Sequence, residues 1–289
     1  MMQASCSRLD AARWHFQHGP IDLIITVDGK ADAIARALDS AWSRFQQVLP
    51  ELVDELALLR QAVRSDRAFE GAVAKRMQAA CWPHRAQFIT PMAAVAGSVA
   101  DEMIEFFSCE PDIQRAAINN GGDIALHLQA NESYRIGLVT DIAQFSAQPD
   151  VVDGSLVICA ADPVRGIATS GWRGRSLSLG IADSVTALAS SAAHADAAAT
   201  MIANAVNVEH AAIRRAPAHT VKDDTDLGSL LVTQAVGVLP PVLVQQALER
   251  GKLQAQRLLM QGHIQGALLV LQTQACAVGQ LEQRSLLAA

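Results

Sequence analysis

Residues 116–128 read AAINNGGDIALHL, two short apolar segments joined by a pair of glycines. Such a pair is typical of a tight β-hairpin, because glycine adopts the positive φ angles that the turn requires. The stretch therefore predicts two antiparallel strands, at residues 116–119 and 123–128. Further short strands are expected at residues 134–139, 156–160 and 184–189.

The flanking sequence adds helices on both sides of these strands. Residues 21–27 (IDLIITV) predict a strand, and apolar residues then recur at helical spacing over residues 34–49 as far as Pro50, where the helix should stop or kink. Because strands and helices do not alternate strictly, we predict an α+β fold with mixed or antiparallel sheets flanked by helices, not a doubly wound parallel sheet. Other helices are expected at residues 92–107, 195–206 and 242–261, and a last strand at 267–273.

The composition is that of a globular chain. Of its 289 residues, 51% are hydrophobic and only 4% are aromatic, so small aliphatic side chains dominate the core. The net charge is −6 and no cluster of Lys and Arg is present, which argues against nucleic acid and against a basic contact with a membrane. The Ala-rich, weakly charged composition favours a homodimer. Small residues in MAAVAGSVADEMIEFF (92–107) would let that helix lie close to a neighbour or a ligand.

The sequence also predicts a cytoplasmic protein. No segment reaches the roughly 18 uninterrupted apolar residues of a membrane span, and residues 1–10 lack the apolar core of a secretion signal. The cysteines are odd in number and widely scattered, which predicts neither a disulfide framework nor a structural zinc site. They are Cys6, Cys81, Cys109, Cys159 and Cys276.

The glycine pair is also a candidate for binding a ligand. Gly121 and Gly122 would bring backbone N–H groups close to the ligand, while Asn120 and Asp123 bond its polar edge. A plain hairpin is the alternative interpretation.

The stretch GIATSG at residues 166–171 is a second candidate, and it reads as a turn. Thr169 and Ser170 would present hydroxyl and N–H groups to a phosphate. Arg173 and Arg175 follow at once and would suit an anionic ligand. The alternative is a plain turn followed by two surface arginines.

A third candidate is a pair of oxygen donors on one predicted helix. Asp196 and Thr200 are four residues apart, so their side chains share a helix face. A carboxylate and a hydroxyl are ligands that Mg²⁺ prefers. The alternative is that Asp196 stabilises a helix N-terminus and Thr200 packs in the core.

The fourth candidate is HFQHGP at residues 15–20. Two histidines three residues apart would hold a metal, but no third ligand is near in sequence. A single ordered histidine before the strand is the better interpretation, and His18 with Asp22 is then an acid–base candidate.

Taken in order, four stretches resemble the ApbE-like superfamily, whose main members are FAD:protein FMN transferases. They are TPMAAVAGSVADEM, NNGGDIAL, GIATSG and DSVTALASSAAHADAAATMIANAV, all within residues 88–206. The sequence is most similar to a small cytoplasmic branch of uncharacterised proteins, and HFQHGPIDLII is a feature of that branch.

This resemblance implies one ApbE-like domain over residues 1–289, built of two intertwined α+β halves of T-fold type, that binds a flavin nucleotide (FAD or FMN) with Mg²⁺. The family's motifs place the metal on Asp196 and Thr200. They place the nucleotide pocket at Asn120, Gly121, Gly122, Asp123, Ala168, Thr169, Ser170, Gly171 and Arg175. We expect Asn120, Asp123, Thr169 and Ser170 around one cavity.

The resemblance further implies Mg²⁺-dependent transferase-like chemistry on the nucleotide's phosphates. In that reaction Arg173 or Arg175 would steady the anion, and Asp183 would either position other groups of the site or act as a general base. His18, the acid–base candidate named above, is the remaining catalytic candidate. The transferases carry a His-containing segment after the Ala-Thr-Ser-Gly motif, whereas residues 172–183 contain no histidine, so flavin transfer to protein threonines should be weak or absent. Two alternatives stay open: a T-fold biosynthetic enzyme that binds a purine- or pterin-like ring through Asp123, and a non-catalytic ligand-binding protein.

Overall fold

The computed structural model describes residues 3–138 and 154–283, and the chain divides into two compact units. Unit 1 consists of residues 1–134, 158–168 and 189–197. Unit 2 consists of residues 135–157, 169–188 and 198–289. Each unit is therefore assembled from segments that are far apart in the sequence.

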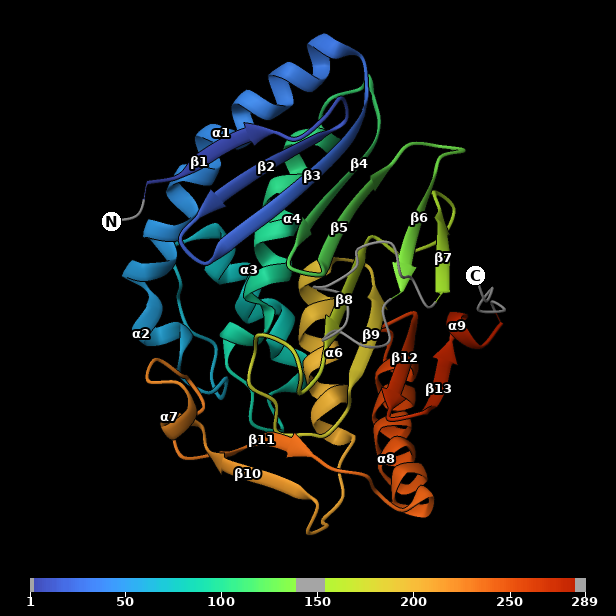
Figure 1. Ribbon diagram of the computed structural model, residues 1–289. Coiled ribbons are helices and arrows are strands. Elements are labelled where there is room, and N and C mark those ends of the chain that lie inside the picture. The colour runs from blue at the N-terminus through green and yellow to red at the C-terminus, as the bar shows by residue number, and fades with distance from the viewer. Residues whose placement is uncertain (1–2, 139–153, 284–289) are drawn as a thin grey trace. The chain divides into compact units, whose positions relative to one another are not determined.

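Unit 1 contains an antiparallel sheet in the strand order β1-β2-β3-β4-β5-β8 (Figure 1). Strand β8 begins in this unit and ends in unit 2. Gly121 and Gly122 form the turn between β4 and β5 with φ angles of 65° and 110°, which confirms the predicted hairpin. The strands are β1 (Ser5–Arg8), β2 (Arg13–His18), β3 (Ile21–Gly29), β4 (Ile113–Asn120), β5 (Asp123–Leu128) and β8 (Gly166–Ser170).

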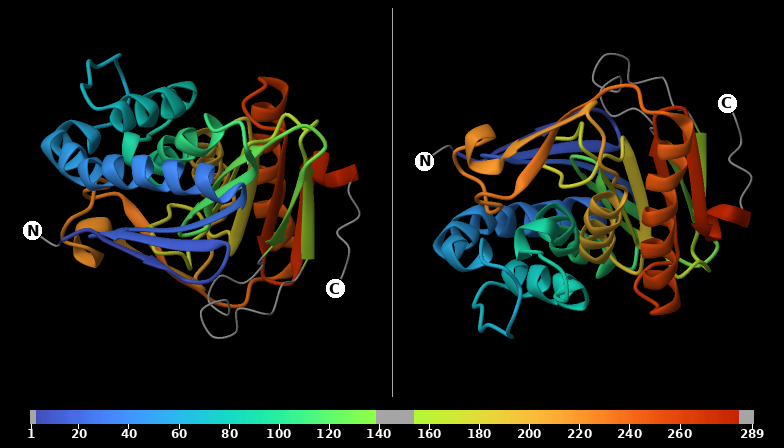
Figure 2. Two further views of the ribbon diagram at one scale, coloured as in Figure 1. Left: turned by 90° about the horizontal axis from the view of Figure 1, so that it is seen from above. Right: turned by 90° about the horizontal axis from the view of Figure 1, so that it is seen from below.

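Helices of unit 1 lie along one face of this sheet (Figure 2). The three longest are α1, α3 and α4, and α4 contacts both α1 and strands β4 and β5. The α-helices are α1 (Ala31–Asp54), α2 (Leu56–Leu59), α3 (Ala72–Cys81) and α4 (Val95–Ser108). Two short 3₁₀ turns, η1 (Trp82–His84) and η2 (Pro91–Ala94), lie between α3 and α4.

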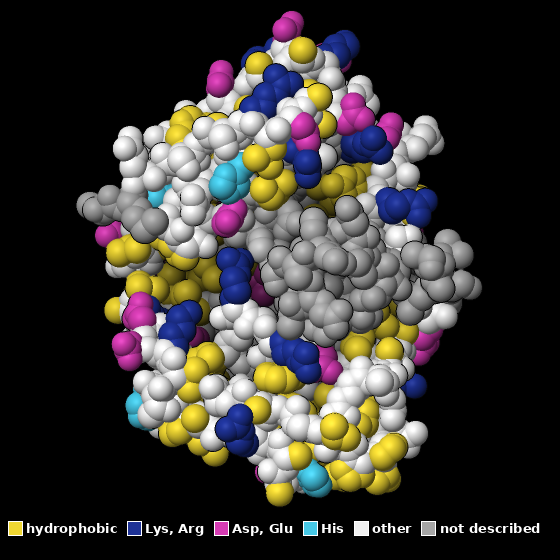
Figure 3. Space-filling model, viewed as in Figure 1, with side chains coloured by type: hydrophobic (Ala, Val, Ile, Leu, Met, Phe, Trp, Pro, Cys, Tyr) yellow, Lys and Arg dark blue, Asp and Glu magenta, His cyan; other side chains and the backbone are white. Residues whose placement is uncertain are grey.

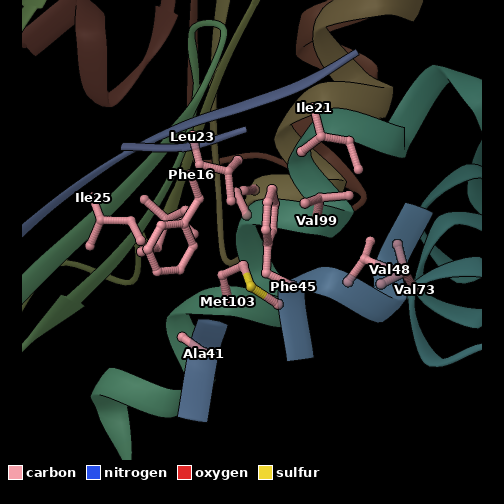
Figure 4. Close-up of a cluster of buried hydrophobic side chains, with 14 of the residues drawn as sticks. Phe16, Ile21, Leu23, Ile25, Ala41, Phe45, Val48, Val73, Val99 and Met103 are labelled. Atoms are coloured by element: carbon pink, nitrogen blue, oxygen red, sulfur yellow. The ribbon is translucent and has the colours of Figure 1, made fainter. Parts of the chain in front are cut away.

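The core of unit 1 forms where the sheet meets α1 and α4 (Figure 4). Phe16 of β2 packs against Phe45 of α1 with their ring centroids 5.4 Å apart, and both side chains are fully buried. Met103 of α4 closes this cluster from the helix side. Such a core fixes the position of α4, the helix whose first turn bonds the site residues Asn120 and Asp196 described below.

Unit 2 contains the strands β9, β12 and β13, which pair antiparallel in that order, and α8 packs against β12 and β13. Two further pairs of strands are β10-β11 and β6-β7. The remaining strands are β6 (Ser133–Leu138), β7 (Gly154–Cys159), β9 (Ser184–Ala189), β10 (Ile213–Pro217), β11 (Leu231–Val236), β12 (Gly266–Leu271) and β13 (Gln274–Gly279). The helices are α6 (Ala192–Ala205), α7 (Ala218–Val221), α8 (Pro241–Met260) and α9 (Gln280–Gln283), and α6 begins in unit 1.

The combination of helices with antiparallel sheets confirms the predicted α+β fold. Local expectations need correction at three places. The GIATSG stretch is strand β8 and not a turn, β12 is followed by another strand, and of the two outcomes expected at Pro50 the helix does not stop there, because α1 continues to Asp54.

The surface and the helices add two further observations. On the face drawn in Figure 3, Lys and Arg side chains are interspersed with Asp and Glu side chains. Within residues 3–138 and 154–283, no helix combines the length and the apolar character that crossing a membrane requires.

Candidate functional site

The Gly-Gly hairpin places Asn120 against the first turn of α4. Asn120 is 5% exposed, and its Nδ2 donates a hydrogen bond to the carbonyl oxygen of Ala96 at 3.1 Å. Asp123 lies directly opposite Asn120 in the β4–β5 register, so both side chains point to the same face of the sheet. Asp123 is also buried. The hairpin therefore directs both predicted polar side chains toward the face that α4 covers.

Asp196 reaches the same turn of α4 from helix α6. Its Oδ2 accepts a hydrogen bond from the Gly97 N–H at 3.0 Å, and the Ala96 N–H also bonds this carboxylate. Asn120 and Asp196 thus bond the two neighbouring residues Ala96 and Gly97. In unit 1, three of the four stretches singled out in the sequence meet at one helical turn.

A second carboxylate completes a reciprocal arrangement between α4 and α6. Asp101 of α4 accepts hydrogen bonds from the N–H groups of Ala192 and Ala193 at 2.9 and 2.8 Å. These N–H groups belong to the first turn of α6, which has no partner for them within its own helix. Each helix therefore satisfies the N-terminal N–H groups of the other with a carboxylate, which the partial positive charge of a helix N-terminus also favours.

Gly97 allows α4 and α6 to approach this closely. A Cβ at position 97 would lie 2.3 Å from the carbonyl oxygen of Ala192, well inside contact distance. The prediction that small residues let this helix lie against a neighbour is therefore confirmed. The neighbour is the beginning of the helix that carries Asp196 and Thr200.

The two carboxyl groups are perturbed by their surroundings. The pKa of Asp196 is raised to about 7, mainly by burial; the Gly97 and Ala96 N–H groups oppose this rise, and the negative charge of Asp101 adds to it. Burial also raises the pKa of Asp101, against the opposing effect of the α6 N–H groups. Near neutral pH, Asp196 is therefore poised to release its proton when a cation arrives.

Asp196 and Thr200 lie four residues apart on α6, as predicted. One carboxylate and one hydroxyl are hard oxygen donors, which suit Mg²⁺. Among the residues that the structure describes, no three His, Cys, Asp or Glu side chains are grouped so that they could hold a metal. The pair fits Mg²⁺ only as part of a shell that water or ligand oxygens complete.

Arg173 and Asp183, both predicted to take part in catalysis, are neighbours in unit 2. Arg173 Nε lies 3.3 Å from Asp183 Oδ1, and both residues line a pocket of about 520 Å³. Trp172 Nε1 donates to the same Oδ1 at 3.0 Å, and the Gln272 N–H donates to Oδ2. Asp183 is 7% exposed, so these donors compensate for its burial.

The rest of this pocket comes from the β12–β13 turn and the segment before α8. Gln272 has a φ of 52°, and its Nε2 donates to the carbonyl oxygen of Gly237 at 2.9 Å. This bond joins the turn to the apolar wall of the pocket. The wall consists of Val236, Val238, Leu239, Pro241 and Val244.

The other predicted residues fall in both units. Ala168 is fully buried on β8 in unit 1, and Gly171 is buried in unit 2. The Oγ1 of Thr169 lies 2.9 Å from the Oγ1 of Thr186, within unit 2. Ser170 is half-buried and Arg175 is exposed. Because Asn120 and Asp123 belong to unit 1 while Thr169 and Ser170 belong to unit 2, their common cavity stays a prediction.

The acid–base pair proposed for Asp22 involves a different histidine. His15 Nε2 lies 2.7 Å from Asp22 Oδ1, on the sheet face opposite to His18. His18 points into the core near Phe45, and its Nδ1 has no hydrogen-bond partner among the described residues. The alternation of strand β2, with Phe16 and His18 on one face and His15 on the other, is the signal that would have found the pair.

Sequence reasoning also missed the groups that hold the candidate residues in place. Asp101 lies in the stretch 92–107, in which only the small residues form a recognisable sequence pattern. Trp172 and the left-handed Gln272 carry no motif, and their contacts with Asp183 arise only in the folded chain.

The chain is similar in sequence to a described family and to several known proteins. A family model described as AbpE bacteria matches residues 4–283. A UPF0280 protein from Methanopyrus kandleri is 37% identical over 156 residues, which cover 52% of this chain and 57% of that protein. One from Methanothrix thermoacetophila is 30% identical over 177 residues, covering 59% and 68%. The chain spans a little over half the length of the first of these relatives.

Solved structures were compared as well. The ApbE protein of Thermotoga maritima gives a TM-score of 0.46 at 12% identity, covering 97% of this chain and 98% of that one. The flavinyl transferase ApbE of Pseudomonas stutzeri gives 0.45 at 10% identity, covering 98% of each chain.

Proposed function

The chain belongs to the AbpE bacteria family, and on that basis we propose that it binds a flavin nucleotide together with Mg²⁺. The observation that carries the proposal is the meeting of Asn120 and Asp196 on Ala96 and Gly97 of α4. Stretches that are separate in the sequence, and that together resemble ApbE-like proteins, form one arrangement in unit 1.

The metal would be held by Asp196 and Thr200 of α6, with phosphate oxygens of the nucleotide and water as its other ligands. When bound, Mg²⁺ neutralises phosphate charge and acts as a Lewis acid. The chain's own part is to hold the Asp196 carboxylate in place. The Gly97 N–H does this from α4, and Asp101 fixes the start of the helix that carries Asp196.

The hairpin would contribute to binding the nucleotide. Asn120 is held by Ala96, and Asp123 lies beside it on the same face of the sheet. Gly121 and Gly122 would let the nucleotide approach the backbone of the turn, because they carry no side chains; the Gly122 N–H itself donates to Asn119 Oδ1.

We assign Arg173 and Asp183 of unit 2 to the same function. The Arg173 guanidinium would donate to a polar group of the nucleotide, and the Asp183 carboxylate would accept a hydrogen bond from it. Thr169, Ser170, Gly171 and Arg175 remain candidates for the nucleotide pocket. A transferase-like reaction on the phosphates is the activity that these groups would support.

The proposal also places the protein in the cytoplasm. The five cysteines, including the buried Cys81 and the exposed Cys6, are thiols that form no disulfide in the described structure, which suits a reducing compartment.

The identity of the bound molecule tests the proposal. The protein is purified under native conditions and denatured, and the released small molecules are identified by mass spectrometry. FAD or FMN supports the proposal, whereas a pterin or purine supports a T-fold biosynthetic enzyme. If nothing is released, titration with FAD and Mg²⁺ followed by flavin fluorescence decides, and absence of binding at millimolar FAD contradicts the proposal.

A further inference from the structure

The pocket of unit 2 has a polar end built around one buried carboxylate. Asp183 is 7% exposed, and its Oδ1 faces Trp172 Nε1 at 3.0 Å and Arg173 Nε at 3.3 Å. Its Oδ2 accepts the Gln272 N–H. A carboxylate offers about four acceptor positions, and these three donors do not use all of them. Asp183 can therefore accept one more hydrogen bond from a molecule in the pocket.

Arg173 stands beside this acceptor. Its guanidinium lies 5.0 Å from the centroid of the Trp172 ring, which supports its flat face, and it lines the same pocket as Asp183. Its Nε is the guanidinium nitrogen that faces Asp183, and a guanidinium carries further N–H donors on its two Nη atoms. The polar end thus presents an acceptor and a donor side by side.

The charges of these two groups balance. A lone anion in the pocket would face the charge of Asp183, and a lone cation would face that of Arg173, in a setting where desolvating an ion is costly. A neutral ligand whose edge carries one hydrogen-bond donor next to one acceptor avoids both the charge repulsion and the cost of desolvating an ion. An N–H group next to a carbonyl group has this character.

The other side of the pocket is apolar. Val236, Val238, Leu239, Pro241 and Val244 supply it, and Val238 is 89% exposed. A volume of about 520 Å³ is within the range of pockets that take small organic ligands. Flat ring faces would cover this hydrocarbon surface while the ring edge meets the polar end.

We infer that the pocket of unit 2 binds a planar heterocycle through a lactam- or imide-type edge, whose N–H donates to Asp183 and whose neighbouring carbonyl accepts from Arg173. This inference rests on the proposed function for the identity of the ring. The flavin ring has such an edge, in which N3–H lies between two carbonyl groups. Two assignments therefore follow: Asp183 accepts a hydrogen bond from the ring N–H, and Arg173 donates one to the neighbouring carbonyl.

The test uses the full chain, riboflavin and 3-methylriboflavin, with EDTA present. Riboflavin has no phosphate, so its binding does not depend on the Mg²⁺ site at Asp196. Methylation at N3 removes the N–H group and leaves the rest of the ring in place. Affinities are measured from the quenching of flavin fluorescence.

We expect riboflavin to bind the wild-type chain at least tenfold more tightly than 3-methylriboflavin, because the methylated ring leaves Asp183 without its donor. In Asp183→Asn this preference should fall to about twofold, since the charged acceptor is lost. In Arg173→Gln both flavins should weaken about fivefold or more. Arg257→Gln, an exposed arginine on α8 in the same unit, is the matched control and should change neither affinity.

Equal affinity of the wild-type chain for the two flavins would overturn the inference, as would failure of riboflavin to bind at concentrations up to its solubility limit. Because Arg173 is an exposed side chain, its variant keeps the test valid if Asp183→Asn does not fold. Failure here is distinguishable from failure of the proposed function, since the coupling of FAD to Mg²⁺ at Asp196 is measured separately.

Discussion

Asp196 has both a structural role and a proposed functional role. It closes the first turn of α4 and is also the candidate metal ligand on α6. The sequence predicted that Asp196 and Thr200 share a helix face. It did not predict that the carboxylate would bond the N–H groups of a different helix, because residues 97 and 196 are brought together only by tertiary packing.

The titration of Asp196 should appear in the stability of the metal-free protein. Burial and the charge of Asp101 raise the pKa of Asp196 to about 7, so the folded chain keeps this proton at pH values where the unfolded chain has released it. This contribution to stability is full below about pH 4 and is lost as the pH rises through about 7. Asp196→Asn carries no such charge. Its free energy of unfolding relative to wild type should therefore increase over this range, measured by urea denaturation in EDTA.

Asp10→Asn serves as the control of opposite sign. The Ala12 N–H and the Arg13 guanidinium lower the pKa of the exposed Asp10. Its variant should lose relative stability, by a small amount, as the pH rises from about 2 to 5. Parallel pH profiles for wild type and Asp196→Asn would contradict the environment described for Asp196.

Gly97→Ala tests the close approach of α4 and α6. The added Cβ would lie 2.3 Å from the Ala192 carbonyl oxygen, so one helix must move. We expect a loss of about 1–3 kcal/mol in the free energy of unfolding, despite alanine's better helix propensity. Gly174→Ala is the matched control, with a nearest contact of 3.3 Å, and should change stability by less than about 0.5 kcal/mol. A Gly97→Ala variant as stable as wild type would contradict the packing.

At the scale of residues, local sequence patterns predict some side-chain positions in the candidate site but not all side-chain partners. The Gly-Gly turn and its flanking Asn120 and Asp123 follow from local sequence, because the turn type selects glycine. The partner of Asp22 does not, since His18 is the nearer histidine in sequence and only strand alternation selects His15, seven residues away.

At the scale of elements, Asp101 should determine how firmly α6 begins. Its carboxylate accepts two N–H groups of that helix and is buried. Asp101→Ala leaves both N–H groups without this partner and should cost about 1–3 kcal/mol of unfolding free energy. Asp101→Asn keeps one acceptor oxygen and should cost less. Thermal denaturation of both variants decides, and equal loss in the two would show that the charge alone matters.

The elements that were mispredicted share a cause. GIATS contains Gly, Thr and Ser and reads locally as a turn, yet β8 pairs with β5 through Ile124 and Ile167. Pro50 does not end α1, because buried residues such as Val48 and Leu52 continue on the same face on either side of it. In both cases tertiary packing outweighed the local preference, which sequence patterns alone cannot weigh.

At the scale of the whole molecule, the chain has an ApbE-like α+β fold, and successive segments of the chain belong alternately to its two units. The strands and helices that carry the four motifs were mostly predictable from apolar periodicity. The grouping of segments into units was not, because it depends on contacts between residues about a hundred positions apart.

The missing histidine predicts a difference in activity from the flavin transferases. The FAD:protein FMN transferases carry a His-containing segment after their Ala-Thr-Ser-Gly motif, and residues 172–183 of this chain contain no histidine. Covalent transfer of flavin to protein threonines should therefore be weak or absent. The chain is incubated with FAD, Mg²⁺ and an acceptor protein, and the products are separated on a denaturing gel. A fluorescent flavin band on the acceptor would contradict this prediction and would support a full transferase activity.

Calorimetry of FAD binding with and without Mg²⁺ tests the central claim most directly. Two protein oxygens are too few for tight Mg²⁺ binding alone, so metal and nucleotide should each tighten the other by the same factor, about tenfold or more. Asp196→Ala should abolish this coupling while retaining weak FAD binding. The account predicts tight binding of FAD only in the presence of Mg²⁺. Equal affinity for FAD in Mg²⁺ and in EDTA would contradict it, and would leave Asp196 as the residue that caps α4.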